Sequence, residues 1–315
     1  MNAPRPLVEL PPVAGGLDVD LPGRDVRLRA TRWPRDARAG GAGTSVLLLH
    51  GLASSRRFWD LVVLGLVDPT TELSVLTLDQ RGHGDSDRPA GPYDGATVAG
   101  DVLTALDALG LSRVVVVGHS WGASTALRLA AVAPERVLAV VAIDGGLASA
   151  RSAGASREQA RERLTPPRLA LPPDSLREVL RAGPLAPWWS AEVEAAVLPL
   201  FGVGEDGLAR ARLPFDAHMA IVDDLLDDRA DSRLGLVSCP AWLVACEALG
   251  PPDPWSAATS AALERARSRL SRPRLLRWTG AVHDVPLQWP ALVAGLIRAA
   301  ADEVGAGVPG TRSAP

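Results

Sequence analysis

The chain has 315 residues, with 33 basic and 36 acidic residues and a formal net charge of −3, and every basic residue is arginine. The lack of lysine excludes a Schiff base to a substrate or to pyridoxal phosphate, and it excludes the lysines of phosphate-binding loops and protein kinases. The balanced charge and the lack of a basic block argue against nucleic acid as a partner.

Several signals predict a cytoplasmic protein without a cofactor. The longest apolar runs have about seven residues, whereas a spanning helix needs about twenty, so no membrane span is expected. Met1–Gly16 lacks the pattern of a secretory signal. Cys239 and Cys246 lie on one predicted strand, too far apart for a disulfide, which is typical of a reducing compartment. The five histidines show no metal-ligand spacing, so no metal is expected.

The apolar pattern predicts an α/β fold with a mostly parallel, eight-stranded sheet and helices on both faces. Continuous apolar runs bounded by Gly or Asp are typical of strands buried on both faces. The first two predicted strands alternate and form an antiparallel pair. In chain order the eight are Leu17–Leu21, Val26–Thr31, Ser45–Leu49, Val75–Leu78, Val114–Val117, Val137–Ile143, Trp242–Ala245 and Arg274–Trp278. Helical periodicity lies between them, over Val98–Leu109, Ser124–Ala133 and Ser256–Leu270.

One region interrupts this alternation. Residues 147–235 contain no convincing strand and predict an inserted helical cap. Its expected helices are Ser156–Leu164, Ser175–Arg181, Ala191–Leu200 and Phe215–Leu226. The core domain is then expected over 15–146 and 236–303, with flexible termini at 1–14 and 304–315.

Gly118-His119-Ser120-Trp121-Gly122 directly follows a predicted strand and precedes a predicted helix. This is the G-x-S-x-G pattern in the strand–turn–helix context that it requires. Such a tight turn raises the serine hydroxyl above the carboxyl edge of the sheet. Ser120 is therefore the expected nucleophile. A serine needs a base, and His283, on a loop after the last strand, is the best-placed candidate.

With these motifs the chain resembles an α/β-hydrolase that carries a helical cap. The resemblance covers about residues 20–300, including His50-Gly51-Leu52, the run Asp79–Ser86 and Asp144-Gly145-Gly146. It implies that the backbone N–H groups of Leu52 and Trp121 form the oxyanion hole. It also implies that His50, His83 and His119 belong to structural motifs.

The acidic partner of the histidine departs from the family's commonest pattern. Leu249 occupies the position after the seventh strand where many members carry Asp. Asp144, at the end of the preceding strand, is the first choice. Asp253 and Glu247 are alternatives, and geometry decides among them.

The expected function is that of a serine hydrolase, which cleaves a small apolar ester, lactone or thioester through an acyl-enzyme on Ser120. Gly51, His119, Trp188 and Trp189 are expected to line the substrate pocket. Two other classes stay open on the same fold. One is a non-hydrolytic biosynthetic enzyme: an acyltransferase, a cyclase, a carbon–carbon hydrolase or a cofactor-free haloperoxidase. The other is a catalytically inactive ligand-binding protein. A homodimer also stays open.

Overall fold

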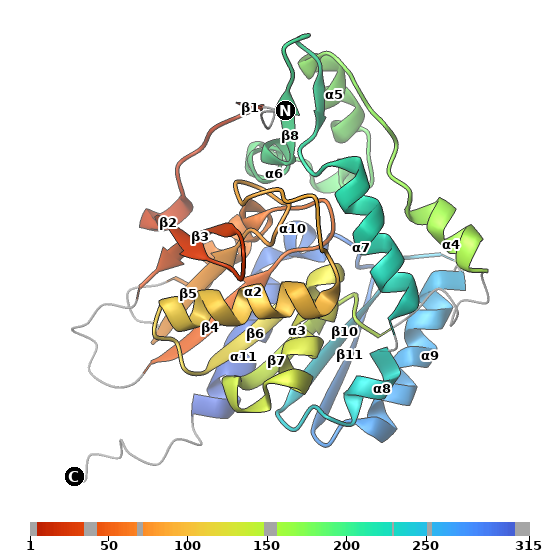
Figure 1. The fold of residues 1–315 in the computed structure, drawn as a ribbon. Helices are drawn as coiled ribbons and strands as arrows, with labels where there is room; N and C mark the ends of the chain where they lie inside the picture. Colours follow the sequence, from red (N-terminus) through yellow and green to blue (C-terminus); the bar gives the residue numbers. More distant parts are fainter. Residues whose placement is uncertain are drawn as a thin grey trace.

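The computed structural model describes residues 5–34, 43–67, 72–147, 156–228, 230–250 and 254–305. Its centre is an eight-stranded sheet of order β11-β10-β7-β6-β4-β5-β3-β2 (Figure 1). The strands are β2 (Leu17–Pro22), β3 (Arg27–Trp33), β4 (Thr44–Leu49), β5 (Leu73–Leu78), β6 (Val114–His119), β7 (Val137–Ile143), β10 (Ala241–Glu247) and β11 (Pro273–Thr279). From β5 to β11 all neighbours run parallel, whereas β3 is antiparallel to β2 and β5. All eight predicted strands are thus confirmed.

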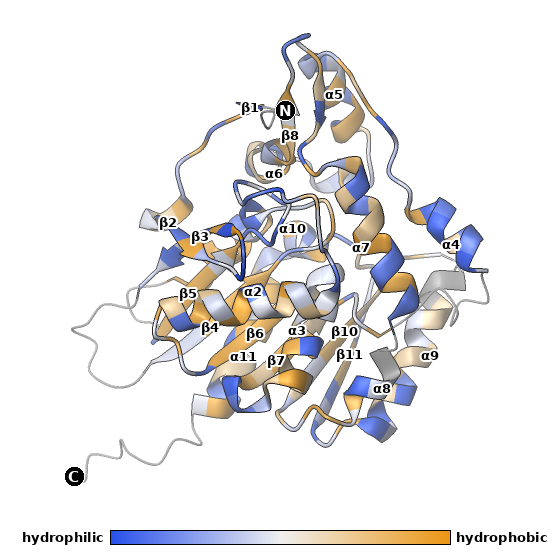
Figure 2. Ribbon diagram, in the orientation of Figure 1, coloured by the Kyte–Doolittle hydropathy of each residue, from blue (hydrophilic) through white to orange (hydrophobic). Residues whose placement is uncertain are grey.

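Helices cover both faces of the sheet, as predicted. One face carries α2 (Gly95–Ala108), α3 (Trp121–Val132), α8 (Ala230–Leu234) and α9 (Pro254–Arg269). The other carries α1 (Asp60–Leu64), α10 (Val285–Gln288) and α11 (Pro290–Gly305). Successive valines of β6 pack alternately into two apolar cores, Val114 and Val116 on one face and Val115 and Val117 on the other. Burial on both faces explains why these four consecutive residues are all apolar (Figure 2).

The part of the insertion from α4 to α7, between β7 and β10, lies beyond the carboxyl edge of the sheet and is called the cap below (Figure 1). Its α-helices are α4 (Arg157–Leu164), α5 (Pro173–Arg181), α6 (Ala191–Val197) and α7 (Phe215–Asp227). The last helix of the predicted cap, α8, packs on α3 and α9 instead. Short 3₁₀ helices occur in the cap and elsewhere: η1 (Val13–Gly15), η3 (Arg56–Trp59), η4 (Pro134–Arg136), η6 (Ala186–Trp188) and η7 (Leu198–Leu200). None of the helices in the described ranges has the length and apolarity that crossing a bilayer requires.

Two predictions about the cap and the amino-terminal arm are wrong. The cap contains two short strands, β8 (Phe201–Val203) and β9 (Ala209–Ala211), and the arm contributes β1 (Arg5–Pro6) to the same small sheet. Strands of two or three residues are too short to show an alternating pattern. Among the described residues, the strand that pairs with the arm is β8, which lies about 200 residues away in sequence. The local sequence pattern of the arm therefore could not predict this pairing.

The arm also contacts the core. Arg57 Nη2 donates to Pro11 O at 2.9 Å, and Trp33 Nε1 donates to Val13 O at 2.7 Å. The part of the arm from Arg5 to Val13 therefore joins the cap to the sheet domain. The remaining predicted flexible segments, 1–4 and 306–315, lie outside the described residues.

Candidate active site

The turn between β6 and α3 holds Ser120 in an unusual backbone conformation. Its φ is +53° and its ψ −117°, a strained region for a residue with a side chain. Ser120 N–H donates to Ile143 O at 2.9 Å, which fastens the turn to the end of β7. A β-carbon on Gly118 would lie 2.1 Å from Gly122 O, and one on Gly122 would lie 2.3 Å from Leu49 O. Both glycines are thus required by close backbone approach.

We expect Gly122→Ala to destabilise the fold by about 3 kcal/mol, because the new methyl group overlaps a backbone oxygen that cannot move aside. Urea denaturation measures this change. Gly295→Ala is the matched control, since Gly295 also lies in a helix and a β-carbon there meets open space. That substitution should stabilise by about 0.5–1 kcal/mol. Equal effects at the two positions would contradict the packing argument.

The loop after β11 brings His283 to the carboxyl edge of the sheet. Gln288 fixes this loop, since its side chain donates to Gly280 O and accepts from Val282 N–H, both at 2.8 Å. His283 Nδ1 lies 2.6 Å from Asp144 Oδ2. The other oxygen of Asp144 accepts from Cys246 N–H at 3.0 Å, so the carboxylate has a fixed orientation.

The environment of His283 favours its charged form. Burial alone would lower the pKa of His283, but the hydrogen bond and the charge of Asp144 outweigh burial and raise that pKa. The His283 side chain is 52% exposed, whereas that of Asp144 is 10% exposed. The exposed part of the imidazole faces the cavity described below, which leaves it accessible to a bound molecule.

Of the other two candidate acids, Glu247 is not brought to His283. Glu247 Oε1 accepts from Arg277 Nη1 at 2.8 Å and from Ser260 Oγ at 3.2 Å, so that carboxylate belongs to a surface ion pair. Asp253 lies outside the described residues. Among the described carboxylates, Asp144 makes the contact with the imidazole.

The loop after β4 places Leu52 beside the turn of Ser120. A β-carbon on Gly51 would lie 3.1 Å from Ser120 Cβ, so this backbone packs directly against the turn. Ala53, with φ +58°, donates its N–H to His83 Nε2 at 3.2 Å and so fixes the bend. Trp121 is the first residue of α3, where a backbone N–H has no acceptor within its own helix. Both predicted oxyanion donors thus belong to segments that meet at Ser120.

Two further histidines hold the loops around the site. His50 Nδ1 contacts Gly51 O at 2.8 Å, and its Nε2 accepts from Gln80 N–H at 3.1 Å. His83 bridges Arg81 O and Ala53 N–H in the same manner. Burial lowers the pKa of His50 to about 4 and that of His83 well below its ordinary value. Neutral imidazoles, each with one donor and one acceptor nitrogen, fit these partners.

A cavity of about 370 Å³ lies between Ser120 and the cap. Of the predicted pocket residues, Gly51, His119 and Trp189 line it, as do Ser120 and His283. Trp188 is not among the residues that line it, although Trp188 and Trp189 both pack against the same apolar core. The remaining lining residues were not singled out from sequence: Ser54, Phe58, Val179, Leu180, Gly183, Pro184, Leu185, Val197, Leu200, Asp284 and Leu287, with Ala53 beside Leu52.

The side chain of Trp121 turns away from the cavity. It is 4% exposed, stacks on His83 with 5.1 Å between the ring centroids, and packs with Tyr93 and Ile221 of an apolar cluster beneath α7. Only the backbone of Trp121 is therefore placed to serve the site. Sequence analysis missed Val179 and Leu180 of α5 as wall residues. The sequence there predicts an amphipathic helix, but it does not show which side chains of that helix face a ligand.

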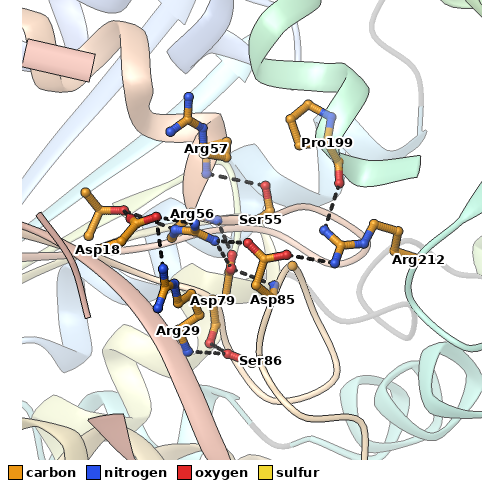
Figure 3. A network of polar contacts seen from close by, with 12 residues as sticks. Asp18, Arg29, Ser55, Arg56, Arg57, Asp79, Asp85, Ser86, Pro199 and Arg212 are labelled. Atoms are coloured by element: carbon orange, nitrogen blue, oxygen red, sulfur yellow. Dashed lines mark hydrogen bonds and ion pairs between the residues drawn. The ribbon is translucent and has the colours of Figure 1, made fainter. Parts of the chain in front are cut away.

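An ion-pair network underlies the loop that carries Leu52 (Figure 3). Arg56, 5% exposed, contacts Asp18 at 3.2 Å, Asp85 at 2.9 Å and the fully buried Asp79. Asp85 also accepts from Arg212 of the cap at 2.7 Å. The network therefore connects β2, the loop after β4, the loop after β5 and the cap.

Comparisons with known proteins agree with this architecture. The family model for the alpha/beta hydrolase fold matches residues 44–190. A solved structure of E-2-(acetamidomethylene)succinate hydrolase superposes with a TM-score of 0.72 at 22% identity, over 91% of this chain and 99% of that one. The chain therefore has the α/β-hydrolase fold, and residues 44–190, just under half of its length, match that family. The predicted fold class and the resemblance are confirmed.

Curated relatives of this α/β-hydrolase-fold chain match over a shorter stretch. A 2-(acetamidomethylene)succinate hydrolase of Mesorhizobium japonicum is 36% identical over 35% of this chain and 38% of its own length. An epoxide hydrolase 3 of Siraitia grosvenorii is 39% identical over 32% of each chain. The alignments thus span about a third of these relatives.

Proposed function

We propose that this protein is a serine hydrolase, which cleaves a small, mainly apolar ester, lactone or thioester through an acyl-enzyme on Ser120. The contact of His283 with Asp144, beside a cavity that Ser120 also lines, carries the proposal. The hydrolase names of the relatives support the class of reaction. The mainly aliphatic cavity wall supports an apolar substrate.

In the proposed reaction, Ser120 Oγ attacks the substrate carbonyl while His283 Nε2 accepts the hydroxyl proton. Asp144 holds the proton on His283 Nδ1 and stabilises the imidazolium that forms. The N–H groups of Leu52 and Trp121 bind the developing oxyanion, each worth about 3 kcal/mol. His283 then protonates the leaving group, and a water that it activates releases the acid from Ser120.

The contact of His283 with Asp144 weakens the case for an inactive ligand-binding protein, which rested on the missing acid after β10.

The buried free thiols of Cys239 and Cys246 support a reducing compartment, such as the cytoplasm, as the location of this protein.

A fluorophosphonate probe tests the proposal, because it phosphonylates only an activated serine. We expect stoichiometric labelling of the wild type at Ser120, located by peptide mass spectrometry, and none of Ser120→Ala. Equal labelling of both proteins would refute the proposed nucleophile. Cys246→Ser serves as a control that removes a nearby buried group and keeps the label.

We expect kcat/KM for a neutral ester to fall as the pH is lowered, because His283 must be neutral to accept a proton. Asp144 raises the pKa of His283, so the midpoint of this fall lies above 6.5, the ordinary value for histidine. Measurements of kcat/KM between about pH 5 and pH 9 locate it. In the residual activity of Asp144→Asn, the midpoint should move to lower pH. An unchanged midpoint would contradict the assigned partner.

A further inference from the structure

Three polar groups in the cavity wall take no part in the proposed reaction. They are Ser54, His119 and Asp284. Ser54 Oγ and His119 Nδ1 are both buried, and neither has a hydrogen-bond partner among the described residues. Buried polar atoms without partners are costly, and in a ligand cavity they point to groups that a ligand or water satisfies.

The available nitrogen of His119 is an acceptor. Its Nε2 lies 2.8 Å from His283 O, and because a carbonyl oxygen only accepts, Nε2 carries the hydrogen. Burial lowers the pKa of His119 well below its ordinary value, so the ring is neutral and Nδ1 has a free lone pair. Nδ1 lies 3.1 Å from where a β-carbon on Gly51 would be, next to Ser120.

Asp284 adds a carboxyl group to the same wall. Asp284 precedes α10, yet its side chain does not cap that helix. Within the described ranges, its carboxyl oxygens accept no hydrogen bond and form no ion pair. Burial raises the pKa of Asp284, and the charge of Asp144 adds to this while His283 opposes it. Among the described residues, the carboxyl group thus has no arginine as a counter-ion, and the positive group that acts on it is the neighbouring His283.

The described lining residues include no arginine, and the chain has no lysine. Arg177 and Arg181, on the helix that forms one wall, pair with Glu194 outside the cavity. Apart from the imidazole of His283, the described wall therefore offers acceptors and a carboxyl group, and no arginine or lysine to receive an anionic group.

We propose that Asp284 is a specificity-determining residue, which selects substrates bearing a cationic group and rejects carboxylate-bearing ones. This inference rests on the proposed hydrolase function. A cationic group would supply a counter-ion to Asp284, whereas a carboxylate would be repelled by it and would find no arginine or lysine in the described wall.

Two series of matched esters test the charge preference. In the acyl series, p-nitrophenyl esters carry a trimethylammonio-butyryl group, its uncharged tert-butyl isostere or a glutaryl group with a free carboxylate. In the leaving-group series, butyrylthiocholine is compared with the uncharged 3,3-dimethylbutyl thiobutyrate. We expect the wild-type kcat/KM of the cationic ester to exceed that of its neutral isostere by about tenfold in at least one series. The glutaryl ester should be the poorest substrate.

Asp284→Asn should bring the ratio of cationic to neutral kcat/KM close to one and improve turnover of the glutaryl ester. Asp174→Asn is the matched control, because it removes the same charge from a cap residue whose side chain is 94% exposed and lies outside the cavity. Its ratio should equal that of the wild type. Because both members of a pair share the same reaction, a general loss of activity leaves the ratio unchanged.

Two results would overturn this inference while leaving the proposed function intact, as long as fluorophosphonate still labels Ser120. One is a ratio of cationic to neutral kcat/KM that does not change in Asp284→Asn in either series, and the other is a wild type that prefers the glutaryl ester. If fluorophosphonate fails to label Ser120 of the wild type, the proposed function itself is refuted. The two failures are therefore distinguishable.

Discussion

Asp144→Asn is expected to lower kcat by about 10⁴-fold with little change in KM, because the acid acts on the transition state rather than on substrate binding. The structure gives a specific reason. Cys246 N–H donates to one oxygen of Asp144, so in the variant the amide oxygen takes that position. The amide nitrogen then faces His283 Nδ1 and forces it to become an acceptor. The imidazole proton moves to Nε2, where it prevents His283 from accepting the proton of Ser120.

Steady-state kinetics on a p-nitrophenyl ester measure this effect. Glu247→Gln is the matched control, and its kcat should stay within about threefold of the wild type, because Glu247 is paired with Arg277. Asp253→Asn is tested in parallel. Wild-type turnover by Asp144→Asn, with a collapse in either of the other two variants, would assign the acid elsewhere.

Arg56→Gln is expected to destabilise the fold by about 4 kcal/mol, which is the usual cost of removing one partner from a buried ionic cluster. Arg56 forms ion pairs with three carboxylates, and one of them, Asp79, is fully buried. Without the guanidinium, these carboxylates repel one another, and each loses a charged donor (Figure 3). Urea denaturation at neutral pH measures the change in the free energy of unfolding.

The pH dependence of that loss provides a further check. Burial raises the pKa of Asp85, but Arg56 and Arg212 outweigh burial and lower that pKa from 3.8 to about 2, so the stability that Asp85 contributes is lost as the pH falls through this range. Without Arg56 the folded-state pKa of Asp85 rises, and the difference from the wild type should therefore shrink as the pH is lowered from about 5 to about 3. Arg27→Gln, which removes an exposed arginine paired with Asp20 and Asp87, should cost less than about 1 kcal/mol. A similar cost for both variants would contradict the burial argument.

The sheet and the position of Ser120 could be predicted because their signals are local. A β6 strand buried on both faces must be continuously apolar, and a turn that brings Gly122 against Leu49 O must contain glycine. The acid could be narrowed only to three candidates, since the choice depends on which carboxylate lies beside His283 in space. Sequence distance gives no information about a 2.6 Å contact between residues 139 positions apart.

The walls of the cavity were harder to predict. Trp188 and Trp189 are neighbours with identical side chains, and both pack against the apolar core, yet of the two only Trp189 also lines the cavity. Their directions depend on the 3₁₀ turn at η6 and on how the cap lies over the sheet. The sequence shows that Asp284 follows His283, but only the structure shows that Asp284 lines the cavity and that its side chain does not cap α10.

The pairing of β1 with β8 limits how this cap can be moved between proteins. The edge of the cap's small sheet is completed by residues that come before the first strand of the core. A chimera that transplants only the insertion into another hydrolase would therefore expose the backbone of β8 as an unpaired edge, open to association with other chains. A graft of the cap would also need to include the segment from Arg5 to Leu7. This segment and the cap would therefore have to be exchanged together when proteins are recombined.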